Sequence, residues 1–197
     1  MPTPRPLTLQ VICDEHRALA AMLRSLPLLL AELRRRQAQP DFAALRAMLF
    51  YLDEFPERLH HPKESSLLFP KLRARAPEIR SVLDRLDEDH LRGERAIRDL
   101  EHALLAFEIM GESRREAFEQ LCERYVHGYL QHMQVEETQV LPLALQHLSA
   151  QDWAELDEAF AGNRDPLAGH AVDAPYQALV QTVLRALPAP LGFGPAL

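Results

Sequence analysis

Residues 60–70 read HHPKESSLLFP, and residues 132–142 read HMQVEETQVLP. The two stretches share a histidine, a glutamate four residues later and a proline at the end, and they are separated by 72 residues. Residues i and i+4 lie on one face of an α-helix, so each stretch predicts a helix with an imidazole and a carboxylate on the same side. The repeated residue types and spacing indicate two similar halves within one chain.

A second pattern precedes each of these stretches. Residues 14–16, DEH, are echoed by residues 88–90, EDH, at a separation of 74 residues. Both histidines lie among apolar residues that recur every three or four positions, as on the buried face of an amphipathic helix. Each half of the chain therefore supplies one single histidine from a first helix and a histidine–glutamate pair from a second helix.

The composition favours helices throughout the chain. Of the 197 residues, 35 are leucine and 26 are alanine, whereas only 16 are β-branched and seven are glycine, which leaves little for a sheet. We therefore expect an all-α fold, an up-down four-helix bundle with a short C-terminal helical appendage. The predicted helices cover about residues 7–37, 42–75, 77–110, 113–148, 149–160 and 174–187.

Local signals refine these helices and the domain organisation. Pro27 should kink the first helix, and three prolines should kink or split the second. Ser113 with Glu116 predicts a capping box at the start of the fourth long helix, and Ser149 predicts the cap of a shorter one. Residues 1–148 are expected to form the bundle. Residues 149–197 are expected to form a helical extension packed on the same domain, with a frayed Pro/Gly-rich tail from residue 188.

Charge and cysteine content exclude several classes of protein. The net charge of −7 and the dispersed basic residues argue against nucleic-acid binding. Cys13 and Cys122 are too few for a disulfide framework or a four-thiolate metal site, and they suit a reducing compartment. The longest apolar stretch, residues 26–31, is too short to span a membrane. We expect a cytoplasmic protein without a nucleic-acid or membrane partner, either a monomer or a homodimer.

The repeated polar residues predict a metal site inside the bundle. Unpaired polar groups buried in an apolar core cost about 1–3 kcal/mol each, and a bound metal would remove that cost. Nitrogen and oxygen donors without thiolate suit iron or manganese better than structural zinc or an iron–sulfur cluster. Two similar halves with two carboxylates indicate two ions rather than one. The inward-facing set is His16, His60, Glu64, His90, His132 and Glu136.

At these residues the sequence resembles the hemerythrin-like (HHE cation-binding) family, over about residues 8–148. The resemblance implies a four-helix bundle with an oxo-bridged di-iron centre, in which manganese or zinc could replace iron. It also implies a protein that binds or reacts with a small diatomic molecule or peroxide (O2, NO or H2O2), in oxidative or nitrosative stress or in iron handling. The alternative is a metal-binding sensor or an iron storage and delivery module without turnover, so an enzyme and a binder both stay open. Carried over by position, the iron ligands are His16, His60, His90 and His132, and the bridging carboxylates are Glu64 and Glu136.

Two positions near these ligands leave alternatives open. Oxygen-carrying hemerythrins have a histidine one turn after the third-helix ligand, whereas this chain has Glu94. Glu94 either becomes a third carboxylate ligand or leaves a coordination position open, and the difference argues against reversible oxygen carriage. His61 is expected to point about 100° away from His60 around the helix, unless a kink at Pro62 exchanges the two. A ferritin-like site is the competing interpretation, but only Glu57-x-x-His60 matches its pattern.

Overall fold

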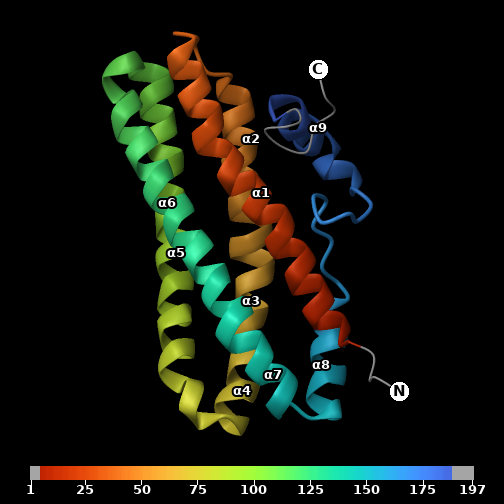
Figure 1. Ribbon diagram of the computed structural model, residues 1–197. Coiled ribbons are helices and arrows are strands. Elements are labelled where there is room, and N and C mark those ends of the chain that lie inside the picture. The colour runs from red at the N-terminus through yellow and green to blue at the C-terminus, as the bar shows by residue number, and fades with distance from the viewer. Residues whose placement is uncertain (1–4, 188–197) are drawn as a thin grey trace.

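The bundle consists of long helical rods that run alternately up and down, as the computed structural model in Figure 1 shows. The structure describes residues 5–187, and within them every regular element is a helix, so the all-α prediction is confirmed. The predicted frayed tail from residue 188 lies outside the described residues.

The first rod is α1 (Leu7–Arg35), and the second joins α2 (Phe42–Leu52), η1 (Asp53–His60), α3 (His61–Lys63), η2 (Glu64–Leu68) and α4 (Phe69–Arg75). The third joins η3 (Pro77–Ile79) and α5 (Arg80–Met110), and the fourth joins η4 (Gly111–Arg114), α6 (Arg115–Val135), η5 (Glu136–Val140) and α7 (Leu141–His147).

The C-terminal part of the described chain returns along the side of the bundle, next to α1 and the second rod (Figure 1). It contains α8 (Ala150–Phe160), η6 (Ala174–Tyr176) and α9 (Gln177–Ala186). Ser149 caps α8 in a capping box with Asp152, as the sequence predicted for this serine. The predicted capping box at Ser113 is wrong, because a 3₁₀ turn precedes α6 and the Ser113 hydroxyl donates to the Met110 carbonyl at 3.3 Å.

Prolines widen the second and fourth rods at three places without breaking them. Segments η1, η2 and η5 are π-helical. Pro56 lies within η1, and Pro70 and Pro142 are the second residues after η2 and η5. A proline has no amide hydrogen, so one carbonyl in the preceding turn loses its usual partner and the backbone relaxes into a wider turn. The amides of His61, Phe69 and Leu141 consequently donate five residues back, to the carbonyls of Pro56, Glu64 and Glu136.

The interior of the bundle has two apolar clusters with a polar layer between them. In α1, for example, Ile12 belongs to one cluster, Leu19 to the other, and His16 lies between them. The same order holds in α5, where His90 lies between Leu86 and Ile97. The apolar layers keep water away from this level of the bundle, which strengthens every electrostatic interaction there. Among the described helices, none is both long and apolar enough to cross a membrane.

Candidate metal centre

Six of the residues predicted as ligands meet in the polar layer, and each rod contributes at least one. All six are buried, and Glu64 has no exposed surface. α1 supplies His16 and α5 supplies His90, whereas the second and fourth rods each supply a histidine and a glutamate one turn apart. The pairs from the latter two rods are His60 with Glu64 and His132 with Glu136.

The two carboxylates lie between two pairs of imidazoles. One Glu64 oxygen is 3.2 Å from Nε2 of His60, and the other is 3.6 Å from Nε2 of His90. Glu136 repeats this arrangement, with one oxygen 3.4 Å from Nε2 of His16 and the other 3.3 Å from Nε2 of His132. Each half of the site therefore offers two imidazole nitrogens and one oxygen from each carboxylate. Donors that share one ion at about 2.1 Å have separations of this order.

The unsatisfied polar atoms of this cluster fit a metal. All four carboxylate oxygens of Glu64 and Glu136 are buried without a hydrogen bond, and so is Nε2 of His60. Orphaned buried acceptors of this kind are rare in folded proteins and call for an explanation such as a bound ion. Two subsets, His16–His60–Glu64 and His61–Glu64–His90–His132, each have donor atoms within 4.8 Å of one another, the spacing that one ion can span. The donor set is suited to hold metal ions.

Protonation compensates part of the buried charge in the metal-free cluster. Burial opposes a charged imidazole, but the carboxylates of Glu136, Asp89 and Glu64 together outweigh it and raise the pKa of His132 to about 10. Burial and the nearby His132 lower the pKa of His90 to about 3. The pKa of Glu64 is raised by burial and by the charge of Glu136. Since metal ligands must be deprotonated, ion binding at neutral pH has to release the proton of His132.

Comparison with known proteins identifies the family. The model of the hemerythrin HHE cation-binding domain matches residues 8–144, more than half of the chain. The chain belongs to the hemerythrin HHE cation-binding domain family. No curated protein is similar enough to count as a match. The matched residues extend into all four rods of the bundle and include every donor of the cluster, so the polar layer lies within the HHE domain.

In this HHE domain the outer ring nitrogens of the four histidines face partners that follow the internal repeat. The acidic residue before each single histidine faces the histidine of the same half. Glu15 lies 2.6 Å from Nδ1 of His60, and Asp89 lies 4.0 Å from Nδ1 of His132. At His60 the acceptor holds the proton on Nδ1 and leaves the Nε2 lone pair directed into the site, whereas Nδ1 of His132 is buried without a hydrogen bond.

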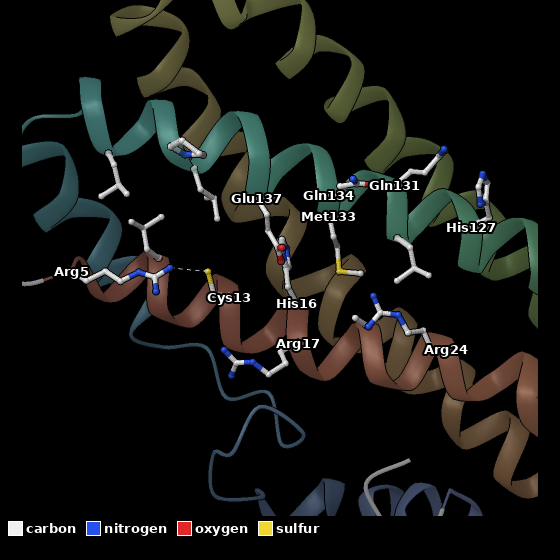
Figure 2. Close-up of a pocket in the computed structure, with 16 residues that line it drawn as sticks. Arg5, Cys13, His16, Arg17, Arg24, His127, Gln131, Met133, Gln134 and Glu137 are labelled. Atoms are coloured by element: carbon white, nitrogen blue, oxygen red, sulfur yellow. Dashed lines mark hydrogen bonds and ion pairs between the residues drawn. The ribbon is translucent and has the colours of Figure 1, made fainter. Parts of the chain in front are cut away.

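The residue after each of the two clustered glutamates faces the single histidine of the other half. Nδ1 of His16 donates to Glu137 at 3.2 Å, and Figure 2 shows these two side chains pointing toward one another across a groove between α1 and the fourth rod. Nδ1 of His90 donates at 2.8 Å to the Ser65 hydroxyl, which donates in turn to Asp87. The roles of Glu15, Ser65 and Glu137 were not predicted from the sequence. The internal repeat could have indicated them, because Glu15 is equivalent to Asp89 and Ser65 is equivalent to Glu137.

The C-terminal extension also reaches the surroundings of the HHE site. The Asn163 amide donates to Glu15 at 3.0 Å, on the same oxygen that faces His60, and its carbonyl oxygen accepts from Lys63. Two residues further on, Asp165 accepts a hydrogen bond from the buried Tyr51 at 2.7 Å. Residues of the extension therefore help to orient His60, a predicted ligand, and no local sequence pattern indicated this role.

His61 is inside the bundle, so the prediction that it points away from the site is wrong. The wide turns of η1 and η2 on either side let neighbouring positions share the interior, and His61 is as buried as His60. Its ring stacks on His90 with centroids 4.0 Å apart. Both ring nitrogens are hydrogen-bonded to protein, Nδ1 to Glu57 at 3.1 Å and Nε2 to the Tyr129 hydroxyl at 2.7 Å.

Glu94 lies outside the cluster. It is exposed and paired with Arg98 on the surface of α5. The buried stripe of α5 continues from His90 through the partly buried Gly93 to Ile97, so position 94 falls on the solvent side. The carboxylate of Glu57 occupies the space beside Gly93, where a Cβ atom would lie 2.7 Å from its Oε1. Glu57 also accepts from Tyr125 at 3.0 Å, and burial raises its pKa to about 8.

Proposed function

We propose that this HHE domain holds an oxo-bridged pair of iron ions and binds or reacts with a small diatomic molecule or peroxide. The observation that supports it best is the position of Glu64 and Glu136, each with one free oxygen toward each half of the site. Two carboxylates that face both halves suit two ions rather than one. The absence of thiolate from the donor set favours iron or manganese.

The chain's own residues would hold the ions and leave room for a ligand. His16 and His60 belong to one ion, His90 and His132 to the other, with one oxygen from each glutamate for both. That makes four donors per ion from the protein, and since Glu94 is exposed it adds none. Iron bound there would supply redox chemistry and free coordination positions for a small ligand. The apolar clusters above and below exclude bulk water from the reacting centre.

Anaerobic loading with ferrous iron followed by metal analysis tests the proposal. We expect two irons per chain, a visible spectrum of an oxo-bridged ferric pair after oxidation, and loss of both in His132→Ala. His127→Ala is the matched control, because His127 is an exposed histidine on the same helix and belongs to neither metal-binding subset. Fewer than one iron per chain, or an unchanged spectrum in His132→Ala, would contradict the proposal.

The reduced protein then distinguishes reaction from binding. Catalytic consumption of added peroxide or nitric oxide would identify an enzyme that acts on an oxidative or nitrosative species. A stable adduct with one ligand per centre, without turnover, would identify the alternative, a sensor. Release of iron to a chelator upon reduction would favour storage and delivery.

A further inference from the structure

A cavity of about 270 Å³ lies between α5 and α6 beside one half of the metal centre. Its outer lining includes Arg92, Arg124 and Gly128, which are exposed. Its inner lining includes His61, Tyr129 and His132, which are buried. The cavity therefore joins the protein surface to the imidazole of a predicted ligand.

The opening depends on a glycine in the middle of α6. A Cβ atom at Gly128 would meet no other atom within 4 Å, so neither packing nor backbone conformation demands glycine there. A glycine inside a helix costs about 1 kcal/mol relative to alanine. Residue 128 lies one turn before His132 on the same face of α6. The missing side chain leaves open the space in front of the His132 ring.

The other approaches to the centre are closed or end at its outer edge. The cavity next to His16 and His60 measures about 10 Å³, room for at most one water. The groove between α1 and the fourth rod is larger, about 940 Å³, and Figure 2 shows His16 and Glu137 meeting there. That groove reaches His16 at Nδ1, which is bonded to Glu137. The cavity between α5 and α6 also meets its histidine on the outer side, where Asp89 lines it, but Nδ1 of His132 has no hydrogen-bond partner there.

We propose that the cavity between α5 and α6 is the entry path for the external ligand, on the His132 side of the centre. The ligand class is a polar or anionic species of two or three heavy atoms, such as peroxide or azide. Arg124, exposed at the mouth, has no ion-pair partner among the described residues and can attract an anion. This inference rests on the proposed function, since it names the ligand class and the side from which the ligand approaches the centre.

Three variants test the path. Gly128→Phe fills the opening, Gly128→Ala leaves it passable, and His127→Phe places the same ring on the neighbouring residue, which lines the α1 groove instead. In the iron-loaded protein we expect azide to associate at least about tenfold more slowly with Gly128→Phe. The two control variants should stay within about twofold of the parent, and iron content should be unchanged in all three.

A second measurement does not require iron. In the metal-free protein, dissolved O2 under pressure shortens the NMR relaxation times of protons that it reaches. We expect the ring protons of Tyr129 and His132 to show this effect more strongly than those of His60, and Gly128→Phe to remove it. Equal effects on His132 and His60, or an effect that survives in Gly128→Phe, would overturn the path even in a chain that bound no iron. An absence of iron together with the expected O2 effect would refute the proposed function and leave the path standing.

Discussion

Replacing Glu64 by methionine is expected to stabilise the metal-free protein while removing its response to metal. Glu64 has no exposed surface and neither of its oxygens accepts a hydrogen bond. Burial and the charge of Glu136 raise its pKa, so the ionised carboxylate destabilises the folded protein until an ion is bound. An unsatisfied buried polar group costs about 1–3 kcal/mol, and an unbranched thioether can fill similar space without that cost.

The same substitution at Glu136 is expected to have the opposite effect. The charges of His132 and His16 outweigh burial and hold the pKa of Glu136 well below its usual range. Glu136→Met would take from both imidazoles the buried carboxylate that faces their Nε2 atoms, a loss of about 3 kcal/mol for a buried pair. The two carboxylates thus have similar positions in the cluster and different electrostatic effects in the metal-free protein.

Urea unfolding followed by circular dichroism, with a chelator present, measures both effects. We expect the free energy of unfolding of Glu64→Met to rise by about 1–3 kcal/mol, and the melting temperature by about 2–4 °C for each kcal/mol in a chain of this length. Addition of ferrous iron should stabilise the parent and leave the variant unchanged. A loss of more than about 1 kcal/mol in metal-free Glu64→Met, or an undiminished response to iron, would refute the reasoning.

Three further substitutions give distinct outcomes. Glu94→Gln should leave the iron content unchanged, and it should change the free energy of unfolding by no more than about 0.5 kcal/mol, because an exposed ion pair such as that with Arg98 contributes little. Loss of iron in this variant would show that Glu94 is a ligand. Burial raises the pKa of Glu57 from 4.5 to about 8, so the folded protein retains a proton that the unfolded chain has released, and stability should fall as pH rises through this window. In urea unfolding, the free energy of unfolding of Glu57→Gln should therefore exceed that of the parent by a few kcal/mol at pH 9 and be similar to it at pH 5. The same pH dependence of stability in both proteins would contradict this. Ser149→Ala should cost about 1 kcal/mol through loss of the α8 cap, visible as a lower midpoint in urea, and an unchanged midpoint would show that tertiary contacts alone hold that helix.

The sequence was sufficient for features that depend on spacing along one helix. An imidazole and a carboxylate at i and i+4 share a face in any helix, so the pairs His60–Glu64 and His132–Glu136 could be predicted without a structure. The repeat predicted that His16 and His90 would join them, because an internal repeat implies similar halves. The helical fold and the cap at Ser149 also follow from local preferences.

Only the tertiary structure decided which way the flanking residues face. His61 is inside because the π-helical turns around it rotate the following residues, and the widening depends on how the chain relaxes at its prolines in the packed bundle. Glu94 is outside because the buried stripe of α5 runs through Gly93, where Glu57 from another rod lies against the backbone. The orienting contact of Asn163 with Glu15 joins residues 148 positions apart. The sequence alone was enough to predict which histidines and glutamates form the cluster. Their orientation and the open path beside Gly128 depend on how separate helices pack, and the residue spacing within one helix carries no information about that packing.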